Sequence, residues 1–222
     1  MKKILFLLLA TGLLFSSCSI TSKIGKQESF TGKITYKITF PDSDFSDAQL
    51  AQMPSRSTLI IGNNKTKSVL RSEMITQMEI KDLQTQNTTA LIEAMGQKFA
   101  IDKTKESIEK ELAEKGIAEV TILEETKEIA GYTCQKAIIK LDGEKNNIFF
   151  SKEIGDKAMN YGSSQYQNLD GIPLEYTIKS DRITMKMTAT KIEKSKVADS
   201  EFEIPEGFTK VTMDELKSMF GS

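Results

Sequence analysis

The residue whose surroundings best define its chemistry is Cys18. Two lysines follow Met1, and a mostly apolar run, Ile4–Phe15, leads through two small serines to this cysteine. A basic start, an apolar segment and small residues before a cleavage point are the features of a secretory signal peptide. The apolar run covers about 18 Å as a helix, short of the roughly 30 Å hydrocarbon core of a bilayer. We therefore predict that residues 1–17 are a signal peptide and that the mature chain begins at Cys18.

The residues around this cleavage point, Phe15–Cys18, resemble a bacterial lipobox, in which the cysteine is acylated and becomes the new N-terminus. The alternative is an ordinary secretory signal cut beside Cys18, with an incidental thiol. We favour lipidation because a cysteine directly after the apolar run has little other use in an oxidising compartment. The several acyl chains of a bacterial lipoprotein would hold the protein firmly at a membrane.

The rest of the chain offers little catalytic chemistry. It contains no histidine, which removes the usual general base, the commonest zinc ligand and the Ser-His-Asp and Cys-His arrangements. Asp42, Asp44 and Asp47 invite comparison with a calcium loop, but the sixth position is Asp47 rather than glycine and the twelfth is Met53 rather than Glu. We therefore expect no metal site, no cofactor and no enzymatic activity.

Cys134 and the methionines are the remaining reactive or adaptable side chains. Cys134 has no Cys-x-x-Cys partner, so its thiolate is not favoured, and we interpret it as a buried strand residue. The chain has 10 methionines, and methionine both fills irregular core gaps and adapts to apolar ligands. Both roles stay open. The residues predicted to line an apolar ligand cavity, chosen from strand faces, are Tyr36, Ile38, Phe40, Met78, Ile80, Met185 and Met187.

Alternating apolar and polar residues predict the sheet that positions these side chains. Every second residue is apolar from Phe30 to Phe40 and again over residues 183–190, the pattern of strands with one buried face. Turn signals such as Asp142-Gly143 separate shorter candidates. One-sided alternation with short connections favours an antiparallel meander. The shorter candidates are Ser57–Ile61, Lys67–Arg71, Ile75–Ile80, Thr89–Met95, Lys98–Ile101, Ala118–Glu124, Thr133–Leu141, Ile148–Ser151 and Leu174–Lys179.

Few helices are expected beside this sheet. Capping boxes predict one helix after Ser46 and another after Thr212, and a third covers Lys105–Lys115. We therefore predict an α+β fold with one curved antiparallel sheet, a half-open barrel, covered on one side by a few short helices. No linker interrupts it, so residues 29–222 are expected to form a single domain after a flexible tether, residues 18–28.

Composition limits the partners. The chain has 222 residues, of which 30 are basic and 31 acidic, giving a net charge of −1. Neither a nucleic-acid surface nor a polybasic membrane surface is implied. We expect a monomer that meets the membrane through its lipid anchor.

Three segments carry a resemblance to known families. Gly131–Lys136 resembles the G-Y-x-C-x-K motif of uncharacterised Gram-negative envelope proteins, including the GLPGLI family, and Asn168–Leu174 partly matches the motif that names that family. Phe202–Phe208 resembles the F-x-I-P-x-G-[FY] ending of a related lipoprotein family. Such families are similar in fold to the carriers LolA and LolB, whose half-open β-barrel holds acyl chains. The resemblance implies a lipid or lipoprotein carrier and transfers no functional residue.

These observations lead to one functional hypothesis and one alternative. We expect a non-enzymatic envelope lipoprotein whose curved sheet binds an apolar ligand, such as an acyl chain or a lipoprotein cargo. The alternative is a structural or protein-interaction module whose core is fully packed. Ser19 is not the Asp associated with inner-membrane retention, so we expect the protein on the periplasmic face of the outer membrane.

Overall fold

The computed structural model describes residues 30–41, 43, 45–179 and 183–220, and it contains one large, open and curved sheet. The predicted signal peptide, the tether and Cys18 lie outside the described residues. Within the described part, no helix is long and apolar enough to cross a membrane. The strands are β1 (Gly32–Thr39), β2 (Arg56–Ile61), β3 (Lys65–Arg71), β4 (Ile75–Asp82), β5 (Asn87–Ala94), β6 (Gln97–Lys103), β7 (Glu119–Ile129), β8 (Tyr132–Leu141), β9 (Glu144–Ser151), β10 (Ile172–Lys179), β11 (Thr184–Lys194) and β12 (Thr209–Lys210).

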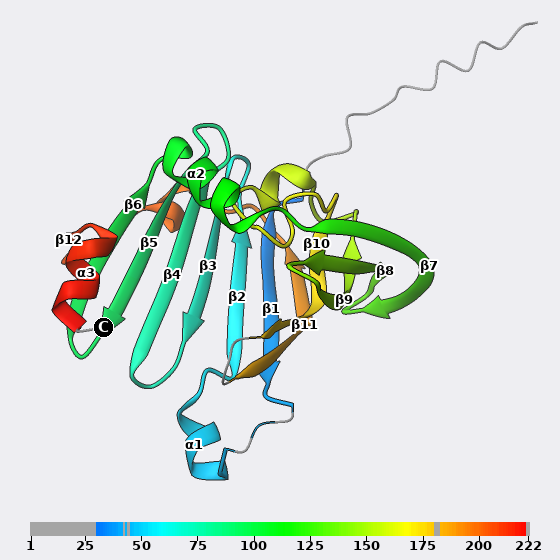
Figure 1. Ribbon diagram of the computed structural model, residues 1–222, viewed down its shortest axis with the longest axis horizontal. Coiled ribbons are helices and arrows are strands. Elements are labelled where there is room, and N and C mark those ends of the chain that lie inside the picture. The colour runs from blue at the N-terminus through cyan, green and yellow to red at the C-terminus, as the bar shows by residue number, and fades with distance from the viewer. Residues whose placement is uncertain (1–29, 42, 44, 180–182, 221–222) are drawn as a thin grey trace, which may run out of the picture.

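The 12-stranded sheet has the order β12-β6-β5-β4-β3-β2-β1-β11-β10-β9-β8-β7. Only the short β12 pairs in parallel, with β6; the other neighbours are antiparallel, as predicted. Strand β1 lies in the middle because it pairs with β2 on one side and with β11 on the other. Figure 1 shows β1 beside β11. A strand from the N-terminal part of the domain therefore pairs, in the middle of the sheet, with a strand from its C-terminal part.

The predicted strands are all present, but several extend beyond their predicted bounds and one strand was missed. Strand β9 begins at Glu144 rather than Ile148, and β11 continues to Lys194. Strand β7 continues to Ile129, beyond the predicted end at Glu124, and β12 was not predicted. The added part of β7 is mostly exposed, and a register shift separates Ile122 from Thr126, so no clean alternation marks it. Strand β12 has only two exposed residues, too few to show any period.

The two faces of the sheet carry separate cores. On the face that we call the inner face, Ile34, Tyr36 and Ile38 of β1 are at most 4% exposed. On the opposite, outer face, a smaller cluster of buried residues covers β2, β4, β5 and β6. Its members are Ile60, Ile80, Leu91, Ala100 and Phe202. Both faces of β2–β6 are thus partly apolar, and each buried large side chain contributes about 1.5–3 kcal/mol.

The helices lie at the margins of the sheet (Figure 1). Helix α1 (Asp47–Gln52) lies at one end, between β1 and β2, and α2 (Lys105–Lys115) lies at the other. Helix α3 (Met213–Phe220) follows β12 at the sheet edge, and the 3-10 helices are η1 (Lys157–Asn160) and η2 (Asp199–Phe202). The predicted capping boxes are present: Ser46 accepts a hydrogen bond from the Gln49 amide, and Thr212 and Glu215 exchange hydrogen bonds in the same way.

Two of the three segments that resemble family motifs have structural roles in the fold. In the first, Ala130 (φ 49°) and Gly131 (φ 84°) form the turn between β7 and β8, since two left-handed residues suit a two-residue hairpin. Lys136 then pairs with Glu125 at 2.7 Å. In the second, Phe202 is 5% exposed and closes the cluster on the outer face.

Candidate functional site

A groove runs along the inner face of the sheet. Three cavities of about 500, 400 and 140 Å³ follow one another there. Leu70 and Gln77 line both the first and the second cavity. Ser57, Ser68 and Tyr176 line both the second and the third. The three cavities therefore form one continuous depression, which we call the concave groove.

The length of the concave groove follows from β3. Thr66 lines the cavity nearest η1, and Ser72, six residues further along, lines the cavity nearest α1. At about 3.3 Å per residue, this span is roughly 20 Å. One leaflet of a bilayer has a hydrocarbon thickness of about 15 Å, half of the whole core. The groove is long enough for one acyl chain.

The lining of the concave groove is mainly apolar, with small polar groups on its floor. Strands β10 and β11 supply one wall, and β2 to β5 supply the floor and the other wall. Glu79 is the one charged residue in the described lining, and its carboxylate lies 3.2 Å from the ammonium of Lys81. The apolar side chains on the inner face of the middle cavity are Leu70, Ala90, Ile92, Ile178, Met185 and Met187.

Three tyrosines close the η1 end of the concave groove. The rings of Tyr36 and Tyr176 meet edge to face at 5.9 Å, and those of Tyr166 and Tyr176 at 5.6 Å. Burial is the main reason that the pKa of Tyr176 rises to about 12 and that the pKa values of Tyr36 and Tyr166 rise well above their ordinary range. All three are neutral near pH 7. The Tyr166 hydroxyl is buried without a hydrogen-bond partner among the described residues.

Five of the seven predicted cavity residues lie in or against one core cluster on the inner face, and three of these five line the concave groove. Tyr36, Met185 and Met187 line the concave groove. Ile38 is 4% exposed and packs in the core beneath them. Phe40 is partly buried against that same core.

Met78 and Ile80 do not join this group. On β4 they alternate with Gln77 and Glu79, and Gln77 pairs with Leu70 on the inner face. Met78 borders the middle cavity, but its side chain points to the outer face. There it packs with Ile80 in the cluster that Phe202 closes.

Several groove residues were not predicted. Tyr176 and Ile178 lie on β10, directly opposite Met187 and Met185, and Ser68 lies on the floor. The alternation within each strand was visible in the sequence. What the sequence lacked was the pairing order that places β10 and β3 on two sides of one groove.

Cys134 has no catalytic surroundings. Its side chain is fully buried, and its Sγ lies 3.5 Å from the carbonyl oxygen of Tyr132. Burial raises the pKa of the Cys134 thiol to about 11, so the thiolate is scarce at neutral pH. No group of His, Cys, Asp or Glu in the described part of the chain is arranged to hold a metal ion.

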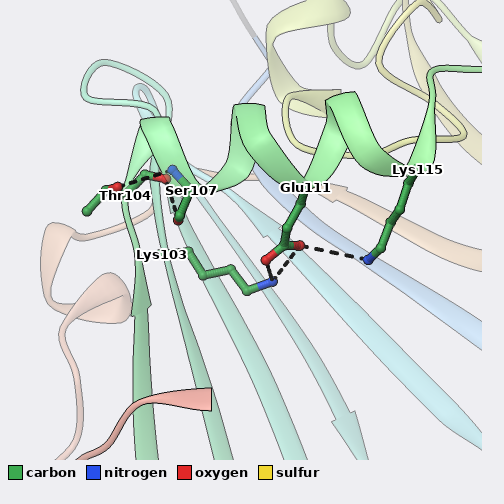
Figure 2. A network of polar contacts seen from close by, with 5 residues as sticks. All are labelled: Lys103, Thr104, Ser107, Glu111 and Lys115. Atoms are coloured by element: carbon green, nitrogen blue, oxygen red, sulfur yellow. Dashed lines mark hydrogen bonds and ion pairs between the residues drawn. The ribbon is translucent and has the colours of Figure 1, made fainter. Parts of the chain in front are cut away.

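Helix α2 is fixed over one end of the inner face by a polar cluster, shown in Figure 2. The Thr104 hydroxyl accepts a hydrogen bond from the Ser107 amide at 3.3 Å, which caps the helix. Lys103 on β6 contacts both carboxylate oxygens of Glu111, at 2.8 and 3.0 Å, and Lys115 lies 3.8 Å from the same group. The hydrogen bond from Lys103 is the main cause of the lowered pKa of Glu111. These contacts hold Ile108 and Leu112 against the sheet.

A second cleft of about 420 Å³ lies beside this cluster, between α2, β6 and α3. Its charged groups already have partners. Lys210 lies 2.7 Å from Asp102, and Glu215 accepts hydrogen bonds from Thr212. This pairing indicates a structural role for the cleft.

The fold and groove define a class of protein: an open, curved antiparallel sheet with an apolar groove on its inner face. Residues 44–217 match the family model described as "N-glycanase peptide, N-terminal domain". The match covers most of the chain, so the protein belongs to this family. No curated protein matches the sequence.

Two solved structures share this fold, both of PNGF-II, in the P21 and C2 space groups. Each has a TM-score of 0.56, with 15% and 16% sequence identity, and each covers 86% of this chain. The chain spans only 33% and 32% of the length of those PNGF-II chains. A β-barrel-like protein of unknown function from Brucella abortus also matches, with a TM-score of 0.38, 11% identity, 75% of this chain and 98% of its own.

Proposed function

We propose that this protein is a non-enzymatic envelope lipoprotein that holds an acyl chain, or a ligand of similar shape, in the concave groove. The observation that carries the proposal is the continuity of the groove, through residues shared by three cavities over roughly 20 Å. Apolar walls with few polar groups are typical of small-molecule sites. In this proposal the sheet acts as the half-open barrel of a LolA-like carrier, related to GLPGLI-type envelope proteins.

The polar groups favour a ligand with a neutral or weakly polar head. Glu79 is already paired with Lys81, so it has little charge to offer. The Tyr166 hydroxyl, buried and unpaired among the described residues, suits an ester or carboxyl oxygen near η1. An unmade hydrogen bond of this kind costs about 1–3 kcal/mol, and a ligand oxygen that accepts it would recover part of that cost.

The test is whether the protein carries or takes up an apolar ligand. Full-length protein, gently extracted from membranes, is examined by native mass spectrometry and titrated with cis-parinaric acid, a fluorescent fatty acid. We expect one bound acyl ligand besides the covalent anchor. Ser68→Phe, which fills the groove floor, is expected to abolish uptake while keeping the melting temperature. Thr121→Phe on the exposed edge strand β7 is the matched control and is expected to bind normally. If wild-type protein is empty and ignores the fatty acid, the proposal is wrong.

Attachment to the membrane is a separate part of the proposal. Cys18 is proposed to carry the acyl chains, with the protein facing the periplasm from the outer membrane. Cys18→Ala is expected to release the protein from the sedimenting membrane fraction into the soluble one. Continued sedimentation with the outer membrane after a wash in about 1 M salt, which screens charge contacts, would show that Cys18 is not the anchor.

A second candidate is a protein-interaction module. It is favoured by the length of PNGF-II, in which this fold accounts for about a third of a longer chain. As such a module, the domain would contact another protein, and its groove would stay empty. An empty groove in native mass spectra, together with normal folding, would favour this candidate.

A further inference from the structure

One end of the sheet exposes apolar side chains at two neighbouring hairpin tips. Met74 and Ile75, at the tip between β3 and β4, are 60% and 43% exposed, and Met95, at the tip between β5 and β6, is 81% exposed. Ile75 pairs with Ala94, and Ala94 pairs with Gln97, so the two tips lie side by side. Figure 1 shows this end of the sheet, which also carries α1.

Met95 is an unusual choice for its position. With φ 52° it is followed by Gly96 with φ 76°, and such two-residue hairpins favour Asn or Asp before glycine. The corresponding turn between β8 and β9 follows this rule, with Asp142 and Gly143. Neither turn geometry nor core packing selects an exposed methionine here. Because the fold does not require a methionine at this turn position, Met95 is a candidate for a functional role.

A row of positive charges borders the same end on the outer face. Lys37 on β1 pairs with Arg56 on β2. Arg71 on β3 follows Leu70, whose partner Ser57 is next to Arg56, so the three cations occupy adjacent positions. All three are exposed, and in the described part of the chain none has an ion-pair partner. We call Lys37, Arg56 and Arg71 the basic row. Like charges side by side on a sheet repel, and the net charge of −1 conceals this cluster.

Acidic side chains at this end do not cancel the basic row. Glu73 is exposed between Arg71 and the first tip, and Asp47 begins α1. Glu93 lies 4.0 Å from Lys98, so its charge is balanced locally. Among the described residues that have no ion-pair partner at this end, the three cations of the basic row therefore outnumber the two acids, Asp47 and Glu73.

The concave groove opens at this end. Met74 and Ile75 line its cavity of about 500 Å³, together with Phe45 and Met53 from the segment around α1. Apolar tips, a basic border and an apolar groove mouth thus lie together. A bilayer with anionic headgroups offers the matching surface, since its phosphates attract cations and its acyl region accepts apolar side chains.

We propose that this end docks on an anionic lipid bilayer. Met74, Ile75 and Met95 enter the headgroup region, and the basic row lies on the lipid phosphates. The docking surface rests on its own residues; only its purpose, which is to open the groove toward lipid, rests on the proposed function. Docking would let an acyl chain pass between bilayer and groove without crossing water.

The predicted anchor permits this orientation. The chain between Cys18 and Gly32 can extend to about 45 Å, whereas β1, with 8 residues, is only about 26 Å long. A lipid at Cys18 can therefore lie in the same leaflet on which the far end of the domain docks.

Tryptophan fluorescence provides the test, because the natural chain contains no tryptophan. Full-length lipidated Met95→Trp protein is placed in vesicles of equal parts phosphatidylglycerol and phosphatidylcholine, and in vesicles of phosphatidylcholine alone, each with brominated acyl chains as quencher. Ile122→Trp is the matched control, since Ile122 is 46% exposed on β7. We expect a blue shift and strong quenching for Met95→Trp in the anionic vesicles only, and neither effect for the control.

The basic row is tested in the same vesicles. Neutralising it with Lys37→Gln, Arg56→Gln and Arg71→Gln should lower the ratio of docked to undocked protein about 100-fold. Raising the salt to about 1 M should also weaken docking, because the screening length falls to roughly 3 Å. Equal quenching of Met95→Trp and Ile122→Trp, or quenching unchanged by salt and by neutralisation, would overturn the proposal.

The docking surface and the groove fail separately in these experiments. Ser68→Phe blocks the groove but leaves the tips and the basic row intact, so it should remain docked. Fatty acid uptake without docking would reject the docking surface and keep the groove. Docking without fatty acid uptake would reject the groove as a ligand site and keep the docking surface.

Discussion

The Tyr36 hydroxyl donates a hydrogen bond to the carbonyl oxygen of Pro173 over 2.9 Å, and both groups are buried. Tyr36 lies on β1 and Pro173 on β10, two strands that are not neighbours because β11 lies between them. The Tyr36 side chain therefore reaches across β11 to the backbone of β10. The bond therefore ties together the two sides of the concave groove near its η1 end.

Removing this bond should destabilise the protein without unfolding it. Tyr36→Phe keeps the ring contact with Tyr176 but leaves the buried carbonyl of Pro173 without its donor. We expect a loss of about 1–3 kcal/mol in the free energy of unfolding, measured by urea denaturation. Tyr132→Phe, at a partly buried tyrosine packed against the same core, is the control and should lose less. Equal losses for the two variants would contradict a special role for the bond.

The buried tyrosines also predict alkaline sensitivity. In the unfolded chain a tyrosine ionises near pH 10, whereas burial raises the pKa of Tyr176 to about 12 in the folded protein. The unfolded state therefore loses protons first, so stability is complete below about pH 10 and falls as the pH rises toward 12. The raised pKa values of Tyr36 and Tyr166 act in the same direction.

Urea midpoints measured by circular dichroism between about pH 8 and pH 11 should show this decline. Cys134 contributes to it as well, since its pKa is raised to about 11. Tyr176→Phe should reduce the slope above pH 10, and Cys134→Ser should reduce it from about pH 9 upward. A midpoint that stays constant to pH 11 would contradict the burial of these groups.

Much of the secondary structure could be predicted because its signals are local. The alternation from Phe30 to Phe40 contains all of β1, and the Ser46 capping box marks the start of α1. The order of the strands could not be predicted in this way. Ile34 pairs with Ile192, and no residue near either one in the sequence specifies that partner.

The candidate site was predicted only in part for the same reason. Whether Met78 shares a face with Met187 depends on the register of every strand between β4 and β11. The outer face of β2–β6 is also apolar, because the segment ending in Phe202 covers it. An apolar position on these strands therefore fits either face, and the sequence alone cannot assign it.

The reactivity of Cys134 provides a direct test of its burial. At pH 8 a thiol with a pKa of about 11 is only about one part in a thousand thiolate, and its burial excludes reagents. We expect no reaction with a disulfide reagent in the native protein and one equivalent in urea. Cys18 is expected to be acylated, so it should not contribute. A fast-reacting thiol that persists in Cys18→Ser protein would show that Cys134 is accessible.

Phe202 should be the most costly single aromatic truncation on the outer face. Its ring is 5% exposed and packs with Ile60, Ile80 and Leu91, and it lies against Gly62 at the turn after β2. Truncation of a buried phenylalanine to alanine costs about 3–5 kcal/mol. We expect Phe202→Ala to lower the free energy of unfolding by that amount in urea denaturation.

Two comparisons make the Phe202 result specific. Ile204 is 40% exposed in the same segment, so Ile204→Ala should cost well under 1 kcal/mol. Because Phe202 lies on the outer face, Phe202→Ala protein that remains folded should still take up fatty acid in the concave groove. A loss below about 1 kcal/mol would mean that the segment does not close the outer core. Loss of uptake by a folded variant would mean that the two faces are coupled.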